Sequence, residues 1–279
     1  MQWVNQPCAG IWKAENAYII TYPISAGKLF NLVLSHHRPQ KLRATEQDVP
    51  IEELHNEYKD FDPRIKRIVD MIDNTVCHTR SKTLDIVVLS ADRSLQSRWP
   101  LMVTGPMKSW SSPRKNVVLM GDAAHSMVNH MAQGAATSME DGAFLGKCIA
   151  PVVQGRMRLD EAVRIYEEER MPKAYAKQQV SFLNGAIWHL PDGPEQAARD
   201  KAMAPELEGR YYVRSSNLYG DPQTVLDVYG YDAEGHAETV LAKYFNGGQE
   251  PFHPETGITK TFQDKYVDWF MSKQGQAKL

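Results

Sequence analysis

The chain has 279 residues, 42% of them hydrophobic and 24% charged, which is ordinary for a folded protein with enough material for a core. Its formal net charge of −2 argues against nucleic acid as a partner. Because no apolar run approaches the ~20 residues of a membrane-spanning helix, no export signal opens the chain and the three cysteines lack metal-ligand spacing, we expect a cytoplasmic protein with no membrane partner.

Two β-prone runs near the N-terminus, residues 17–24 and 29–35, are joined by four residues and predict a β-hairpin. Tyr22 belongs to the first run, where side chains alternate between the two faces of the strand. Further strands are predicted at residues 84–90 and 99–104, because both runs are short and apolar.

Two short helices are predicted between these strands. The first is acidic and begins at Asp48. Asp62 followed by Pro63 is a typical start for the second, since the carboxylate can cap the helix and proline suits its first position. Apolar residues then recur from Ile65 at spacings of three and four, which predicts an amphipathic helix to about Asn74.

The C-terminal part of the chain is predicted to be mainly helical. A long helix should run from Leu159 to about Ala186, with a kink or break at Pro172. The polar residues 192–210 are expected to be mobile, and residues 221–245 should supply C-terminal helices.

The most informative stretch of the chain spans residues 117–150. Residues 117–120 are a short apolar run that ends at Gly121, which predicts a buried strand of an α/β sheet. Asp122 would then lie at the carboxyl end of this strand, where open α/β sheets place their ligand contacts. Its carboxylate can accept hydrogen bonds from vicinal hydroxyl groups; the alternative is a cap for the turn that follows.

Small residues open the next predicted helix. Gly134, Ala135 and Ala136 allow a ligand to approach the free backbone N–H groups at the positive end of the helix dipole. The same residues also permit tight packing of the helix against a sheet, and the two roles are compatible.

This stretch resembles the second FAD-binding motif of the flavin-dependent aromatic hydroxylases, the family of the salicylate and p-hydroxybenzoate hydroxylases. The motif reads Gly-Asp-Ala-Ala/Cys-His, a short loop, Gln-Gly and then Glu-Asp on a helix. Here it corresponds to residues 121–125, 133–134 and 140–141. Looser similarity extends to Tyr-Pro, Gly and Asn-x-Val within residues 22–33, and to Tyr-Glu-x-x-Arg-x-Pro-Lys at residues 166–173.

The resemblance implies an FAD-dependent monooxygenase that uses NADH or NADPH and O₂ to hydroxylate a phenolic or polyketide-like aromatic substrate, and similarity to fungal members points to secondary metabolism. In this family the residue that matches Asp122 binds the ribityl hydroxyls of FAD. The backbone of Gly134, Ala135 and Ala136 would stabilise negative charge at the N1–C2=O edge of the reduced flavin. Together with Gly121, these are the candidate cofactor-binding residues.

Tyr22 is the candidate catalytic residue. In the fungal hydroxylases that this chain resembles, a tyrosine on a strand of the substrate domain helps to bind and deprotonate the phenol, which makes the ring a better nucleophile. The alternative is an ordinary cross-strand aromatic residue. Asn129 stands where the family usually has proline, in the loop over the face of the flavin where oxygen reacts, and this changes the rigidity of the loop.

A metal reading of Asp122, His125 and His130 is disfavoured, because a second carboxylate or a cysteine partner is missing, and we expect no metal. His125 is interpreted as a polar packing residue near the cofactor. Glu140 and Asp141 are interpreted as ion-pair or capping partners rather than acid-base catalysts.

One feature of the family is missing. Its members open with Gly-x-Gly-x-x-Gly, which holds the FAD pyrophosphate at a helix N-terminus, whereas no two glycines of this chain are separated by a single residue. We therefore expect the chain to correspond to the C-terminal portion of such an enzyme, with an exposed apolar sheet edge. This predicts weak or absent FAD binding, and association as a homo-oligomer or with a complementing chain.

The predicted fold is α/β, mixed with α+β features: a partial FAD-binding α/β fold joined to a β-sheet substrate domain, with C-terminal helices. The predicted parts are a substrate-binding sheet over residues 1–110, the second half of the FAD-binding domain over residues 111–190, and a helical region over residues 191–279.

Three functions stay open: an FAD-dependent hydroxylase, a flavin-poor remnant that serves as a binding or accessory protein, and a different enzyme such as a hydrolase using Asp122 and His125. The intact motif favours the first and the missing fingerprint favours the second. The lack of a recognisable nucleophile–base pair disfavours the third.

Overall fold

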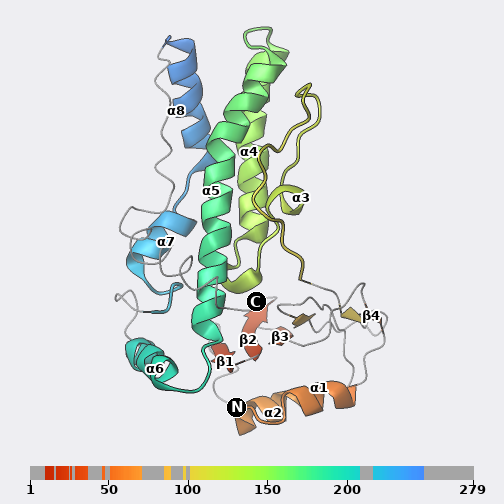
Figure 1. Cartoon of the computed structure of the whole chain (residues 1–279), viewed down its shortest axis with the longest axis vertical. Helices are drawn as coiled ribbons and strands as arrows, with labels where there is room; N and C mark the ends of the chain where they lie inside the picture. The colour runs from red at the N-terminus through yellow and green to blue at the C-terminus, as the bar shows by residue number, and fades with distance from the viewer. Residues whose placement is uncertain are drawn as a thin grey trace. The chain divides into compact units, whose positions relative to one another are not determined.

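The computed structural model describes residues 10–15, 17–24, 26, 29–36, 46–47, 51–70, 85–88, 97–98, 101–207 and 216–247. It contains helices and a small antiparallel sheet, so the chain has the mixed fold that the sequence predicts (Figure 1). The chain divides into two compact units, one of residues 1–102 and 188–197 and one of residues 103–187 and 198–278. The predicted three-part division stays a prediction. Among the described helices, none combines the length and apolar character needed to cross a bilayer.

The first unit is organised around an antiparallel sheet with strand order β1-β2-β3-β5, while β4 and β6 form a separate pair. The strands are β1 (Gly10–Lys13), β2 (Ala17–Ile24), β3 (Leu29–His36), β4 (Glu46–Gln47), β5 (Asp85–Val88) and β6 (Ser97–Arg98). The predicted hairpin is confirmed, since β2 pairs with β3 and places Tyr22 opposite Asn31. The strand predicted at 84–90 is also confirmed by β5.

The strand predicted at residues 99–104 is wrong for its described part. Residues 101–104 have no regular structure, and residues 99–100 lie outside the described residues. The amide of Thr104 donates to the carbonyl of Ser126 at 3.2 Å, so this backbone bonds to a loop and not to a neighbouring strand.

The described helices within residues 1–102 are α1 (Ile51–Glu57) and α2 (Pro63–Val69). The predicted start of α2 is confirmed, since Asp62 accepts the Arg64 amide at 2.8 Å and proline follows it. Residues 71–74 of the predicted helix lie outside the described residues. The core of the unit joins the apolar face of α2 to one face of the hairpin, and it comprises Ala17, Ile19, Leu32, Leu34, Tyr58, Ile65, Ile68 and Val69.

The remaining helices are α3 (Asp122–His125), the 3₁₀ helix η3 (Asn129–Met131), α4 (Gly134–Val153), α5 (Leu159–Trp188), α6 (Pro194–Leu207), α7 (Pro222–Tyr229) and α8 (Ala233–Phe245). In the second unit α8 packs beside α4, and α5 runs along them (Figure 1). Their shared core includes Phe144, Cys148, Tyr166 and Ala237, each fully buried. The predicted starts of α4 and α5 and the predicted C-terminal helices are confirmed.

Two expectations for the helical part need correction, a break at Pro172 and the absence of a helix from residues 192–210, whereas a kink at Pro172 stays a prediction. Helix α5 passes through Pro172 without interruption. Proline removes only one backbone N–H, and fully buried residues on either side, Tyr166 and Ala174, hold the helix in the core. The segment expected to be mobile at residues 192–210 contains α6, because Pro194 suits the first helical position and the alanines that follow favour helix.

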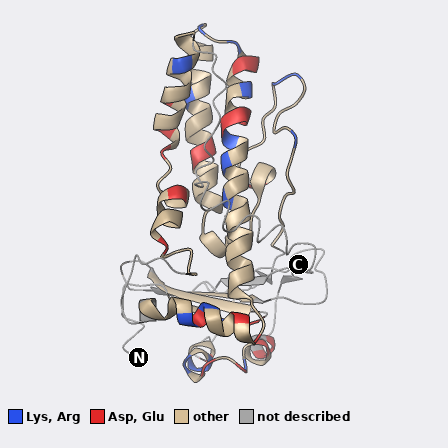
Figure 2. Cartoon of the chain, turned by 60° about the vertical axis from the view of Figure 1, so that its left-hand side comes forward, with Lys and Arg blue, Asp and Glu red and all other residues tan. Residues whose placement is uncertain are grey.

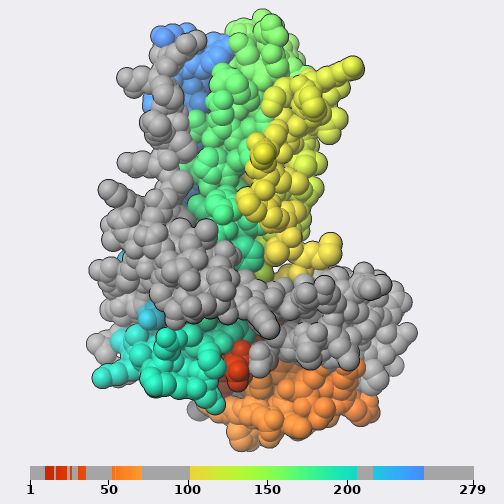
Figure 3. Space-filling view, in the orientation of Figure 1, coloured from red at the N-terminus to blue at the C-terminus, as the bar shows by residue number. Residues whose placement is uncertain are grey.

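The buried strand predicted at residues 117–120 is also wrong. Val118 forms only an isolated bridge with Ser111, Val117 is 58% exposed and Met120 is 39% exposed. The bridge is closed by two backbone bonds, from Leu119 to Trp110 and from Ser112 to Val117. Figure 3 shows the segment before α3, in yellow, along the outside of the green helices. A strand needs partners for its backbone groups, and within the described part of the chain this run has one short partner.

Candidate functional site

The turn at Gly121 places Asp122 at the surface. Gly121 has φ +59° and ψ −145°, a backbone conformation that side chains other than hydrogen disfavour. A Cβ at this position would stand 2.9 Å from Ser138 Oγ, so both the conformation and the space call for glycine. Asp122 follows as the first residue of α3 and is exposed.

The N-terminus of α4 is open beside this carboxylate. Gln133 precedes the helix without a capping hydrogen bond from its side chain, and Gly134 begins it. The first amides of a helix have no partner within it, so they are available to a ligand at the positive end of the dipole. Ala135 is exposed and Ala136 is half-buried. A Cβ built on Gly134 would lie 4.0 Å from Asp122 Oδ1, so the carboxylate and the first turn of α4 face the same space.

The buried carboxylate of Asp141 holds the Gly121 turn in place. Asp141 Oδ2 accepts the Gly121 amide at 3.0 Å and lies 2.5 Å from His125 Nε2. Its other oxygen accepts Arg170 Nε at 3.0 Å, and both Asp141 and Arg170 are fully buried. Burial by itself raises the pKa of Asp141, but the hydrogen bond from His125 and the charge of Arg170 hold that pKa below its ordinary value. The carboxylate is therefore charged and triply bonded.

A second buried set supports the start of α4. Glu140 contacts Arg170 Nη2 at 3.0 Å and Lys177 Nζ at 2.5 Å, and Lys177 Nζ also donates to Gln133 Oε1 at 3.0 Å. Burial lowers the pKa of Lys177, against the opposing charge of Glu140. The interpretation of Glu140 and Asp141 as ion-pair partners is confirmed by these contacts.

His130 and Tyr22 are the other residues singled out in the sequence. His130 is buried, and its carbonyl accepts the side-chain amide of Asn184 at 2.6 Å. No group of three or more possible metal-ligating side chains occurs among the described residues. Tyr22 lies on β2 in the first unit and is 36% exposed; its catalytic role stays a prediction.

Sequence reasoning missed Arg170 and Lys177, which lie seven residues apart on α5. Arg170 belongs to the Tyr-Glu-x-x-Arg-x-Pro-Lys pattern, and this was the only signal for it. A charged residue in a helix normally points to solvent, and nothing local in the sequence says that Asp141 and Glu140 are its partners about thirty positions earlier.

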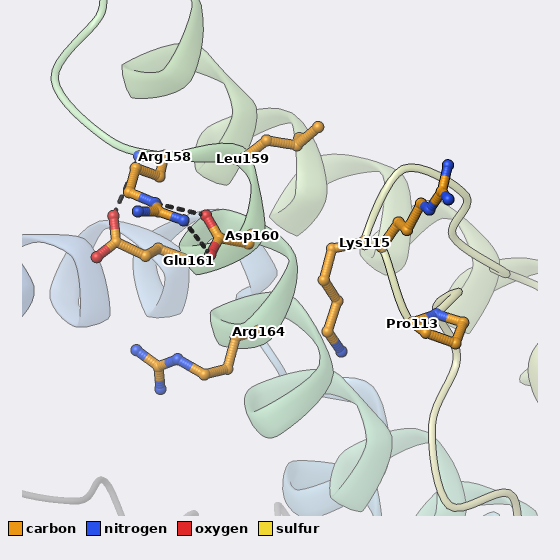
Figure 4. A pocket seen from close by; sticks show the side chains of 8 residues that line it. Pro113, Lys115, Arg158, Leu159, Asp160, Glu161 and Arg164 are labelled. Atoms are coloured by element: carbon orange, nitrogen blue, oxygen red, sulfur yellow. Dashed lines mark hydrogen bonds and ion pairs between the residues drawn. The ribbon is translucent and has the colours of Figure 1, made fainter.

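Two hollows occur elsewhere in this unit. Figure 4 shows the larger one, of about 590 Å³, which is lined by Pro113, Arg114, Lys115, Arg158, Leu159, Asp160, Glu161 and Arg164. Its cations are largely neutralised by ion pairs, such as Arg158 with Asp160 at 2.9 Å. A smaller hollow of about 240 Å³ adjoins α3 and includes Trp110, Ala124 and His125 in its wall. Neither of these two hollows includes Asp122 or the first residues of α4; Asp122 and Ala135 are exposed.

Comparison with known proteins shows which proteins the chain resembles. A family model described as FAD binding domain matches residues 70–181. The chain is 28% identical to the FAD-dependent monooxygenase OpS4 of Beauveria bassiana, over 86% of this chain and 51% of that protein. It is also 28% identical to the 3-hydroxybenzoate 6-hydroxylase of Klebsiella oxytoca, over 78% of this chain and 47% of the relative.

Solved structures agree on the fold. Native FqzB covers 91% of this chain with a TM-score of 0.60 at 19% identity, and the chain spans 53% of it. A salicylate hydroxylase in complex with substrate covers 82% with a TM-score of 0.54 at 18% identity, and the chain spans 48% of it. The chain is thus similar in sequence to FAD-dependent monooxygenases and shares their fold over the part that it covers. It spans about half the length of the curated relatives that it matches.

Proposed function

We propose that this chain carries the ribityl- and ring-contacting part of the FAD site of an aromatic hydroxylase. The observation that carries the proposal is the shared space between the Asp122 carboxylate and the open N-terminus of α4. Asp122 accepts hydrogen bonds from ribityl hydroxyls. The amides of Gly134, Ala135 and Ala136 hold the N1–C2=O edge, where the helix dipole stabilises negative charge.

The proposed reaction is hydroxylation of a phenolic or polyketide-like aromatic compound with O₂ and NADH or NADPH, in secondary metabolism. FAD supplies the redox chemistry when it is bound. The names of the relatives support an aromatic substrate, since one is a 3-hydroxybenzoate 6-hydroxylase. Tyr22 is the proposed residue that binds the phenol and accepts its proton.

A second candidate is a binding or accessory protein that completes a flavin site only together with another chain. It is favoured by the exposure of Asp122 and Ala135, and by the exposed Val117 and Met120. The hydrolase alternative is not favoured. His125 is 3% exposed and paired with the buried Asp141, so it cannot act as a base for a nucleophile at the surface.

Flavin titration of the purified chain tests the proposal. Because the proposed contacts come only from Asp122 and the first turn of α4, flavin binding should be saturable but weak, with a Kd on the order of 1 µM to 1 mM. Because the proposed contacts involve only the ring and the ribityl chain, riboflavin should bind within about threefold of FAD.

Substitution provides the matched comparison. Asp122→Ala should weaken binding of both flavins at least about tenfold, since an acceptor for the ribityl hydroxyls is lost. Asp192→Ala changes an exposed aspartate outside the site and should leave binding unchanged. The proposal is refuted if the natural chain does not bind either flavin, or if the two variants bind alike. Hydroxylation by the chain alone would decide against the accessory role.

A further inference from the structure

Two buried cations of α5 reach the two segments that form the proposed flavin site. Arg170 is fully buried and Lys177 is 4% exposed. Seven residues correspond to about two helical turns, so both side chains leave α5 on the same face. Figure 2 shows positive and negative residues interspersed along the long helices, whereas these two cations point inward to partners on α4.

Arg170 supports the turn that carries Asp122. Its Nε donates to Asp141 Oδ1 at 3.0 Å, and the opposite oxygen of the same carboxylate accepts the backbone N–H of Gly121 at 3.0 Å. The turn is therefore joined to α5 through a single buried carboxylate. The backbone group that Asp141 holds is immediately before Asp122.

Lys177 supports the other half of the site. Its Nζ donates to Gln133 Oε1 at 3.0 Å, and Gln133 is the residue immediately before the first helical residue of α4. Glu140 links the two cations, with Arg170 Nη2 at 3.0 Å and Lys177 Nζ at 2.5 Å. The two cations and the two carboxylates thus form one connected network of hydrogen bonds. This network bonds to Gly121, just before Asp122, and to Gln133, just before the first turn of α4.

We infer that Arg170 and Lys177, acting through Asp141 and Glu140, form a clamp that sets the position of the Asp122 carboxylate relative to the first amides of α4. The inference rests on the proposed function, because it assigns these residues the task of holding two flavin contacts in register. They are positioning residues and touch no ligand. A site of this kind needs its groups held within about 0.5 Å, and buried hydrogen-bonded charges fix position more sharply than apolar packing does.

Hydrogen exchange of the flavin-free chain tests the clamp directly. Arg170→Met should raise amide exchange at residues 121–125 at least about tenfold, and Lys177→Met should do so at residues 133–137, with smaller changes in α8. Arg170→Lys and Lys177→Arg keep the charge and guard against misfolding; they should give intermediate effects. Arg164→Met is the matched control, because Arg164 lies on the same helix in an exposed pair with Glu168.

Flavin titration of the same variants completes the test. Arg170→Met and Lys177→Met should each weaken flavin binding at least about fivefold, and Arg164→Met should not. The clamp is overturned if exchange rises uniformly with the loss of global stability, or if the site segments exchange as in the natural chain. Asp122→Ala separates the two ideas, because it should weaken flavin binding at least about tenfold without changing exchange at Gly121. If the natural chain binds no flavin, the proposed function fails, and the exchange pattern still decides the clamp.

Discussion

Replacement of Gly121 by alanine should destabilise the helical unit, because two separate effects act at this residue. The conformation at φ +59° and ψ −145° costs a residue with a Cβ about 1–3 kcal/mol. The new Cβ would also stand 2.9 Å from Ser138 Oγ. Rotation of that hydroxyl relieves the clash but breaks its bond to the Gly134 carbonyl, which contributes about 0.5–1.5 kcal/mol. We expect a total loss of about 1.5–4.5 kcal/mol.

Urea unfolding followed by circular dichroism measures this loss, and two further variants separate the effects. Gly146→Ala is the control, because Gly146 lies within α4 with open space around its Cβ position, and alanine should stabilise the helix by about 0.5–1 kcal/mol. Adding Ser138→Ala to Gly121→Ala removes the clash but not the strain, so most of the loss should remain. Full rescue by Ser138→Ala, or a loss below about 0.5 kcal/mol in the single variant, would refute the reasoning from backbone conformation.

Three other predictions follow from neighbouring contacts. Burial alone would raise the pKa of Glu167, but hydrogen bonds from Lys115 and from the 109–111 segment hold that pKa at about 2. The free energy of unfolding should therefore fall by about 1–3 kcal/mol as the pH drops from about 4.5 towards about 2. Urea unfolding at a series of pH values should show a weaker pH dependence in Glu167→Gln. Tyr231 bonds to His236 at 2.8 Å and lies over the Arg170 guanidinium at 5.1 Å. Tyr231→Phe should cost about 0.5–1.5 kcal/mol in the same assay, and Tyr231→Leu a further ~0.5–2 kcal/mol; equal losses would exclude a cation–π contribution. Val117→Lys should reduce self-association in sedimentation velocity without loss of stability, since the side chain is 58% exposed, and an unchanged sedimentation profile would exclude this run as the contact.

Local signals in the sequence were enough for the hairpin and for most helices. Asp62 with Pro63 marked the start of α2, and the hairpin followed from two alternating runs with a short connection. Gly134 marked the start of α4, and the motif drew attention to Asp122. In each case the determining interaction lies within a few residues along the chain, so it can be inferred without knowing the tertiary structure.

The errors arose where distant contacts decide the structure. The 117–120 run is apolar enough for a core strand, but a strand also depends on neighbours that no local pattern supplies. Pro172 breaks an isolated helix, yet α5 is held by core residues on both sides of it. The role of Arg170 could not be inferred locally, because its partners lie on α4, far from it in sequence.

The Gly121 turn shows how the proposed flavin contacts can keep their geometry while the sheet around them is sparse. The turn is fixed by a buried carboxylate of α4, and that carboxylate is neutralised by Arg170 and bonded to His125. None of these bonds comes from a parallel strand. The position of Asp122 therefore depends on the packing of α4 against α5 rather than on sheet neighbours. Sheet neighbours would therefore not be needed to create the contact geometry between Asp122 and the first turn of α4.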